Sequence, residues 1–557
     1  MRTFRFLALL FIALSPASLM AQATIHVGSG QTYTTIQSGI NAASDGDTVL
    51  VSPGTYKENI DFKTKPILIT TDAGSGPQPA TTIIDGSGLG PVVILSNIPP
   101  THTLLTPGIR GFTIQNGGIP QTSGGLQGAI SISGGGTTFL SISHNIIKNN
   151  FCQSINIAGP SVSITSNEIE LTTAPSTCPA GEGKGSAIYI TGSSDVSIIA
   201  ANTIENNTAS VAASSDKGGG AGINIAGISR SDIFNNIIRN NTTTGYGGGI
   251  YYANVPKIYL NNNLIYGNKG ISGGVDIVVP GSSVGPVVGF IANNTIAENS
   301  GIGTTASVAS DLFIGGNLAQ YVVINNIIVG YVNGQSAVNC AAQYSSQTLT
   351  PLVFDHNDVY SIPSSTNKPF GGVCTSPAGT FGNISVDPSF KSATAAALTA
   401  GTSDFHLQTG SPAIDTGNND ALTSPYVISL DMDNHVIPQD ATGVGYAIID
   451  MGAYEASSGA VNPPAPALAL TPDAYTYTAG QTATLTASFY AQPPTGGDSA
   501  GGTVTFYEDG ASIGTVTVPG VTILTLSTTF TTAPLTQGIH SFNAIFSANA
   551  PELPSAS

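Results

Sequence analysis

The sequence predicts an all-β solenoid of stacked coils, and three observations lead to this fold class. A phrase with Asn in first place and Ile or Val two places later recurs at intervals of 22 to 35 residues, the repeat length of a solenoid. Its flanking segments are rich in β-branched residues, as strands are. The chain has no Trp, which propeller blades would show, and no Leu at the fixed offsets of leucine-rich repeats. A parallel β-helix fits these features best.

Aligned on the Asn, the copies show two aliphatic columns. The copies begin at Asn145, Asn167, Asn202, Asn236, Asn263, Asn294, Asn326 and Asn357. Two places after the Asn stand Ile147, Ile169, Ile204, Ile238, Ile265, Ile296, Ile328 and Val359. Three places before it stand Ile142, Ile164, Ile199, Ile233, Leu260, Ile291, Val323 and Phe354. We expect both columns to face a core shared by stacked coils, and each Asn to hydrogen bond to the Asn one coil away.

The first 23 residues have the features of a secretory signal peptide. Two basic residues precede an apolar run over residues 6–20, and Ala21-Gln22-Ala23 matches an Ala-x-Ala cleavage site. The apolar run is too short to span a membrane comfortably, and no later stretch is long and apolar enough. We therefore predict a secreted or cell-surface protein that starts near Thr24 and inserts into no membrane.

The charge balance restricts the class of ligand. Removing Arg2 and Arg5 leaves 13 basic residues against 32 acidic ones, a formal charge of −19. This excess of acid argues against nucleic acid and anionic lipid as partners. Only 8% of the residues are charged, so Ser, Thr, Asn and Gly must cover much of the surface. Such a surface suits sugars, or simple solvation by water.

Residues 24–60 are expected to form an N-terminal cap. Within residues 33–43, Ile36, Ile40 and Ala43 fall on one face of a helix that could close the end of the solenoid. A turn at residues 45–47 leads into a strand at residues 48–51.

Three segments of this cap carry a family resemblance. Tyr33-Thr-Thr-Ile-Gln37, Asp45-Gly-Asp-Thr-Val49 and Pro53-Gly-Thr-Tyr56 resemble the start of secreted bacterial right-handed parallel β-helix proteins with a pectin-lyase-like fold. The coil Gly111-Phe-Thr-Ile-Gln-Asn116 is similar to the same group. The resemblance covers about residues 24–390 and implies a β-helix over residues 61–390. It implies no activity, because this fold hosts lyases, hydrolases, tailspikes and adhesins.

Residues 391–456 are expected to form a C-terminal cap. Asp387-Pro-Ser-Phe390, Gly410-Ser-Pro-Ala-Ile-Asp415 and Asp450-Met-Gly-Ala-Tyr-Glu455 resemble the choice-of-anchor Q module, which follows β-helix repeats in bacterial surface proteins. The Arg of that module's closing step is missing here. The resemblance implies surface display and supplies no catalytic residue.

The last segment changes to the alternation of antiparallel strands. Residues 457–467 contain three Pro and form a stiff linker. Residues 468–557 carry short alternating strands around an Asp509-Gly510 hairpin turn, which predicts an Ig-like β-sandwich. This part resembles the bacterial Ig-like repeats of surface proteins.

Four Cys in a secreted chain predict two disulfides. We align Val338-Asn-Cys340 with Gly372-Val-Cys374, which places Cys340 and Cys374 in one column a coil apart, within bridging reach. Cys152 and Cys178 are also about one coil apart. Two free buried thiols are the alternative.

The position three residues after each corner Asn should face solvent. It is occupied by Lys148, Glu170, Glu205, Arg239, Tyr266, Ala297, Val329 and Tyr360, and the first five are the predicted ligand-binding residues. With coils about 4.8 Å apart, Glu170 and Glu205 could be the carboxylate pair of a retaining glycosidase, about 5 Å apart. The interpretation we favour is a charge ladder that keeps the sheet soluble, with no catalytic residue.

A calcium site is the one cofactor that the sequence suggests. Asp415, Asp431, Asp433 and Asp450 crowd the segment after the coils and could supply hard oxygen ligands to Ca²⁺. Their spacing is not that of an EF-hand, and solvated turn aspartates are the alternative. Gly281-Ser-Ser-Val-Gly285 matches a hydrolase elbow, but no strand-to-helix turn surrounds it.

The leading hypothesis is a non-catalytic secreted or cell-surface rod that presents a polar face to polysaccharide, for binding or adhesion. One alternative is a polysaccharide lyase or glycoside hydrolase that acts along the outward column. The Asp pair and Gly-His-Gly of pectin-hydrolysing β-helix enzymes are missing from this sequence. The other alternative is a purely structural stalk. No oligomeric state is predicted.

Overall fold

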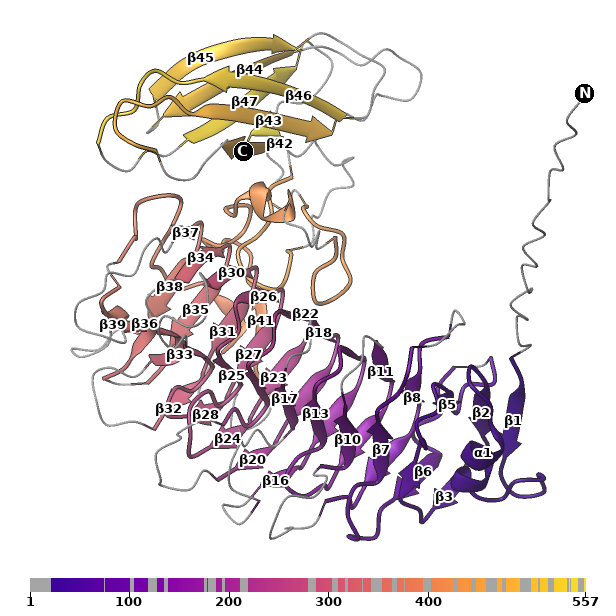
Figure 1. Cartoon of the computed structure of the whole chain (residues 1–557). Coiled ribbons are helices and arrows are strands. Elements are labelled where there is room, and N and C mark those ends of the chain that lie inside the picture. Colours follow the sequence, from indigo (N-terminus) through magenta and orange to yellow (C-terminus); the bar gives the residue numbers. More distant parts are fainter. Residues whose placement is uncertain are drawn as a thin grey trace, which may run out of the picture.

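The computed structural model shows an almost entirely β protein in which three long parallel sheets run side by side (Figure 1). The structure describes residues 22–74, 76–100, 105–118, 128–134, 139–174, 178, 187–192, 196–210, 219–278, 287–302, 309–315, 319–332, 334–341, 353–362, 368–374, 376–393, 402–423, 429–439, 441, 447–456, 468–472, 477–490, 502–508, 511–518, 525–537, 540, 542–548 and 555–556. Most of the predicted signal peptide, the linker 457–467, residues 281–285 and the turn 509–510 lie outside this part of the chain.

Three sheets form the faces of the solenoid, and the strands of each sheet stack in chain order. Sheet A contains β1 (Thr24–Val27), β2 (Thr48–Val51), β5 (Leu68–Thr70), β8 (Gly108–Arg110), β11 (Leu140–Ser143), β14 (Val162–Thr165), β18 (Ser197–Ala200), β22 (Ser231–Phe234), β26 (Lys257–Asn261), β30 (Val287–Ala292), β34 (Ala319–Ile324) and β37 (Val353–Asp355). Sheet B contains β3 (Gly54–Tyr56), β6 (Thr82–Asp85), β9 (Thr113–Gln115), β12 (Ile146–Lys148), β15 (Glu168–Glu170), β19 (Thr203–Glu205), β23 (Ile237–Arg239), β27 (Leu264–Tyr266), β31 (Thr295–Ala297), β35 (Ile327–Gly330) and β38 (Asp358–Ser361). Sheet C contains β4 (Ile60–Asp61), β7 (Val93–Ser96), β10 (Ile130–Ser133), β13 (Ile155–Ala158), β17 (Ile188–Thr191), β21 (Ile223–Ala226), β25 (Ile250–Ala253), β29 (Val275–Val278), β33 (Ala309–Gly315), β36 (Ser336–Ala341) and β39 (Lys368–Gly372). A short fourth sheet contains β16 (Thr173–Ala174), β20 (Thr208–Ala209), β24 (Thr242–Thr243), β28 (Lys269–Gly270) and β32 (Ser300–Gly301).

The pairing confirms the predicted columns. Each strand pairs in parallel with the strand one coil further along the chain, so Ile147 lies opposite Ile169, and Ile169 opposite Ile204. In sheet A, Ile142 lies opposite Ile164 in the same way. Both columns are buried along their whole length in one continuous apolar core. This arrangement of coils is consistent with a parallel β-helix.

The predicted Asn ladder is present at the corner between sheets A and B. Asn202 donates from both its backbone nitrogen and its Nδ2 to Oδ1 of Asn236, at 2.9 Å each, and Asn236 bonds to Asn263 in the same manner. Every member is preceded by a residue with positive φ, for example Ala201 at 55°. The ladder runs from Asn145 to Asn357 and continues one step beyond the predicted copies, to Asn383.

A second ladder, which the sequence reasoning did not single out, follows sheet B. It joins Asn207, Asn241, Asn268 and Asn299 and ends at the buried carboxylate of Asp311, which accepts from Nδ2 of Asn299 at 2.9 Å. The strands β19, β23, β27 and β31 of sheet B are thus held at both ends by stacked side-chain amides. The stack lacks a carboxamide at one coil, where Thr172 stands in the Asn position.

The predicted N-terminal helix forms as α1 (Ile36–Ala42), with Thr35 as its N-cap. The carboxylate of Glu58 accepts from the backbone nitrogens of Ile36 and Gln37, at 2.9 and 3.0 Å. At the other end, Nζ of Lys65 donates to the carbonyls of Ile40, Asn41 and Ala43. An anion at the N-terminus and a cation at the C-terminus both interact favourably with the helix dipole, so the coils beneath α1 hold it in place.

Both predicted disulfides form, Cys152 with Cys178 and Cys340 with Cys374. The predicted column of the second pair is wrong, because Cys340 lies opposite Gly372 and Cys374 follows two residues later. The strand β39 therefore aligns Phe370 with Val338, and the bridge closes across the turn after the strand.

The segment after the coils packs on the outward face of sheet B. Its strands β40 (Phe390–Ser392) and β41 (Asp404–Leu407) pair antiparallel, and a 3-10 helix, η1 (Asn419–Thr423), follows. We call residues 384–456 the cap. Phe390, Phe405 and Met451 of the cap share an apolar cluster with Leu264 and Val329 of sheet B.

The C-terminal residues form two antiparallel sheets with one core. The first contains β42 (Leu468–Pro472), β43 (Thr484–Tyr490) and β46 (Thr525–Thr531). The second contains β44 (Gly502–Glu508), β45 (Ala511–Val518), β47 (Phe542–Ala548) and β48 (Ser555–Ala556). Leu485 of the first and Phe506 of the second belong to the same buried cluster.

The ladder makes a prediction about stability. Replacing Asn236 by Ala leaves the buried donors of Asn202 without their acceptor, and we expect the free energy of unfolding to fall by about 3 kcal/mol. Denaturant unfolding followed by circular dichroism measures the loss. The control is Asn156→Ala, on the outward side of β13, which should cost far less. Equal losses for the two variants would show that an Asn of the ladder contributes no more to the free energy of unfolding than an outward-facing Asn.

Candidate functional site

The outward column of sheet B is formed as predicted, with one side chain from each coil. Its members lie opposite one another in the order Asp85, Gln115, Lys148, Glu170, Glu205, Arg239, Tyr266 and Ala297. Period-two alternation turns these residues away from the buried column of Ile147 and Ile169. We call the stretch from Asp85 to Arg239 the polar row.

The polar row is open, and the next two members of the column, Tyr266 and Ala297, are covered. The side chains from Asp85 to Arg239 are partly exposed, whereas Tyr266 is only 6% exposed and Ala297 is fully buried. The cap causes this change, because Phe405 lies 4.8 Å from Tyr266 between ring centroids. Tyr266 therefore does not sit in the open strip with the other predicted ligand-binding residues. It lies under the cap at the end of the row.

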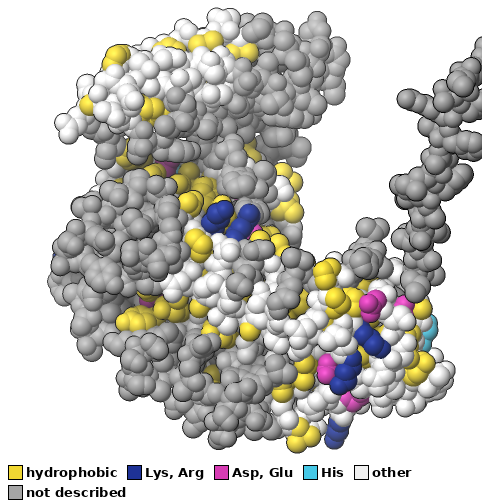
Figure 2. Space-filling model, viewed as in Figure 1, with side chains coloured by type: hydrophobic (Ala, Val, Ile, Leu, Met, Phe, Trp, Pro, Cys, Tyr) yellow, Lys and Arg dark blue, Asp and Glu magenta, His cyan; other side chains and the backbone are white. Residues whose placement is uncertain are grey.

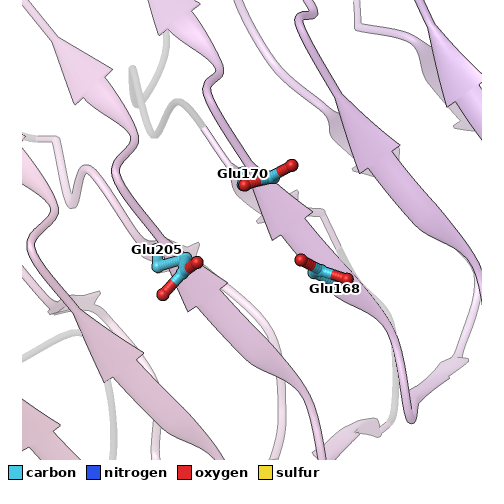
Figure 3. A group of neighbouring side chains, drawn as sticks. All are labelled: Glu168, Glu170 and Glu205. Atoms are coloured by element: carbon cyan, nitrogen blue, oxygen red, sulfur yellow. The ribbon is translucent and has the colours of Figure 1, made fainter.

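Three carboxylates meet in the middle of the row (Figure 3). Glu168 and Glu170 come from β15 and Glu205 from β19, and one oxygen of each lies within 4.8 Å of the others. Burial raises the pKa of the Glu170 carboxyl above its ordinary value, and Glu168 and Glu205 raise it further, while Lys148 opposes them. The predicted approach of Glu170 and Glu205 is therefore real, and Glu168 joins them.

Arg239 closes the row on the side of the cap. Its Nε donates to Glu205, and its Nη1 donates to the hydroxyl of Tyr266 at 2.8 Å. Burial alone would lower the pKa of Arg239, but the hydrogen bonds to Tyr266 and Glu205 raise it. The guanidinium is thus a fixed, permanently charged group that neutralises one of the three carboxylates.

The coil that carries Glu168 and Glu170 departs from the repeat. Leu171 has φ of 55° and is 46% exposed, at a corner where Asn149 and Asn206 stand in the neighbouring coils. A Leu in this left-handed region is strained, and Thr172 interrupts the second ladder at the next residue. Departures from a repeat that cost stability tend to mark functional positions.

A shallow open hollow adjoins the polar row. It is lined by Ser87, Gly88, Asn116, Gly117, Gly118, Asn149 and Phe151. Asn116 and Asn149 directly follow Gln115 and Lys148, so the hollow lies where the strands of the row end. It offers amides and one aromatic ring. On the face drawn in Figure 2, charged side chains are sparse and gather mainly over the N-terminal coils.

The four predicted calcium ligands all lie in the cap, where Asp415 and Asp431 lie near Asp450. Asp415, Asp431 and Asp450 are buried in the cap, and their carboxylates accept backbone N–H groups, such as the nitrogen of Asp415 on Asp450 at 2.7 Å. Asp433 instead pairs with Nε2 of His406 at 2.6 Å. These contacts give the aspartates a role in folding the cap, and calcium binding stays a prediction.

Buried polar groups on the outward side of sheet C escaped the sequence reasoning. Asn224 and Asp276 are fully buried there, and burial raises the pKa of Asp276 to about 7. Asn224 is the middle residue of the Ile223-Asn-Ile225 triplet, whose outer residues face the core. The middle residues of such triplets form an outward column of their own, and that pattern could have revealed them.

Comparison with protein-family models, with curated proteins and with solved structures finds no match for this chain. None of the helices in the described ranges has the length and apolar character of a membrane span. Two disulfides are typical of proteins outside the cytoplasm.

The buried acids predict a pH dependence of stability. Burial raises the pKa of Asp276, Glu298 and Asp358 to about 7 each, whereas free Asp and Glu titrate at about 3.9 and 4.3. The folded state therefore binds these protons more tightly, so their contribution to stability is full below about pH 4 and is lost as the pH rises through 7. We expect the free energy of unfolding, measured with denaturant, to be lower at pH 8 than at pH 5. A fully buried acid such as Asp276 should account for about 2 kcal/mol of this difference.

Asp276→Asn should flatten this profile, and Asp45→Asn, at an exposed turn, should leave it unchanged. Stability that increases from pH 5 to pH 8 would contradict the assignment.

Proposed function

We propose that this chain is a secreted or surface-displayed right-handed parallel β-helix protein that binds polysaccharide, without catalysis, along the polar row. The Ig-like C-terminal domain and the choice-of-anchor-like cap would serve display and spacing. The row offers amide, carboxylate and ammonium groups from consecutive coils, about 4.8 Å apart, to an extended ligand.

One observation carries this proposal. The outward column of sheet B is partly exposed and polar from Asp85 to Arg239 and becomes covered at Tyr266. A continuous strip with a closed end suits a polymer that lies along the stacked coils. The hollow beside Gln115 and Lys148 adds the aromatic ring of Phe151 and two amides, groups that suit a sugar.

Binding to a glycan array tests this proposal. Lys148→Ala, in the row, should weaken binding to the recognised glycan by about tenfold, as expected for the loss of about 1.4 kcal/mol. Lys257→Ala is the matched control, since Lys257 is an exposed lysine on sheet A. Equal weakening by both variants would place the binding surface elsewhere, and an array without signal would favour a structural stalk.

A second candidate function rests on the carboxylate pair. Oxygens of Glu170 and Glu205 lie within 4.8 Å of each other, close to the separation of about 5 to 5.5 Å between the carboxyl groups of retaining glycosidases. Glu170, whose pKa is raised by burial, would be the acid, and Glu205, paired with Arg239, the nucleophile. The elimination chemistry of a lyase would use the same face.

Product release separates the two functions. Incubation with the bound glycan, followed by reducing-end assay and absorbance of unsaturated products, should show no turnover if the protein only binds. Turnover that is lost in Glu170→Gln and Glu205→Gln, but kept in Lys257→Ala, would establish the enzyme instead.

A further inference from the structure

Tyr266 of β27 lies between the cap and the polar row. Its ring packs against Phe405 of β41, with centroids 4.8 Å apart and planes at 57°. Phe405 is itself 2% exposed and meets Phe390 edge to face at 5.2 Å. The ring of Tyr266 is therefore clamped in the apolar cluster between the cap and sheet B, and its position depends on the docked cap.

The hydroxyl of Tyr266 points the other way, toward the row. It accepts a hydrogen bond from Nη1 of Arg239 at 2.8 Å, and Nε of the same guanidinium donates to Glu205. A planar guanidinium held at two of its nitrogens has little freedom to rotate. Lys148 lies in the same column on the other side of the carboxylates, and within the described part of the chain it forms no ion pair.

We infer that Tyr266 is a positioning residue: the cap, acting through Phe405 and Tyr266, fixes Arg239 against Glu205 and so leaves Glu168 and Glu170 as the carboxylates that a ligand meets. That a ligand meets these carboxylates rests on the proposed function. The relay, by which we mean the series of contacts from Phe405 through Tyr266 and Arg239 to Glu205, does not. Each step of the relay is a contact between neighbouring side chains.

The relay predicts how the charges in the row respond when a step is removed. Without the Tyr266 hydroxyl, Arg239 keeps one partner and can swing toward solvent, since its side chain is 34% exposed. The negative charge of Glu205 is then less well compensated, and Glu170 on the neighbouring coil takes up a proton more readily. The ring of Phe at this position would still fill the space against Phe405.

The test measures the titration of Glu170 in the free protein, so it needs no glycan. The chain has nine glutamates, and selective ¹³C labelling of their carboxyl groups gives a spectrum of few signals. We expect Tyr266→Phe to raise the pKa of the Glu170 carboxyl by about half a unit, and Arg239→Gln to raise it by at least as much. Tyr360→Phe is the matched control, because Tyr360 stands in the same outward column three coils away and should leave Glu170 unchanged.

A second variant tests the part played by the cap. Phe405→Leu keeps the Tyr266 hydroxyl but loosens the packing of the Tyr266 ring. We expect the pKa of the Glu170 carboxyl in this variant to lie between its values in the wild type and in Tyr266→Phe. The relay is overturned if Arg239→Gln moves the titration of Glu170 while Tyr266→Phe leaves it in place.

The same variants separate this inference from the proposed function. If a glycan binds, Tyr266→Phe should weaken binding about threefold with little change in thermal stability. The pH dependence of glycan binding should shift together with the pKa of the Glu170 carboxyl. Shifted titration without any glycan binding would support the relay and reject the proposed function. Glycan binding together with an unchanged titration of Glu170 in Tyr266→Phe would support the proposed function and reject the relay.

Discussion

The hydrogen bond between stacked side-chain amides is the interaction on which the rest of this structure depends. In the coils from Asn145 to Asn357, an Asn gives two donors to the Oδ1 of the next Asn, at a corner where the preceding residue has positive φ. The amide is buried, so a missing partner would leave donors unpaired in an apolar interior, at a cost of about 1 to 3 kcal/mol for each group. The ladder therefore fixes the register of successive coils, and a slip of one residue would also turn Ile147 and its equivalents outward.

The same register creates the candidate site. Because Glu170 and Glu205 occupy equivalent positions, in-register stacking brings their like charges together. Lys148 and Arg239, on either side of them in the column, offset this repulsion. The coil at the centre gives up two features of the repeat, with Leu171 at a strained corner and Thr172 in place of the amide. At this coil the chain thus loses stabilising features of the repeat at the place where its carboxylates gather. This coincidence is the reason for proposing that the functional site lies there.

Much of this arrangement follows from local sequence, and what could not be predicted depends on distant contacts. The Ile and Asn columns, the outward row and α1 all rest on spacing within one coil, and the structure confirms them. The burial of Tyr266 depends on Phe405, which is 139 residues away in sequence, and no pattern around Tyr266 signals it. The wrong column for Cys374 has a similar origin, since the last coil is irregular and Phe370, rather than Gly372, aligns with Val338.

The charged grip on α1 has a consequence for assembly. Stacked parallel strands present unpaired backbone groups at each end, and such edges invite other copies to add on. Glu58 and Lys65 lock a short helix over the N-terminal end, where a foreign strand would otherwise find the core of the first coil. We expect the loss of these contacts to expose the edge of the first coil to the strands of another copy.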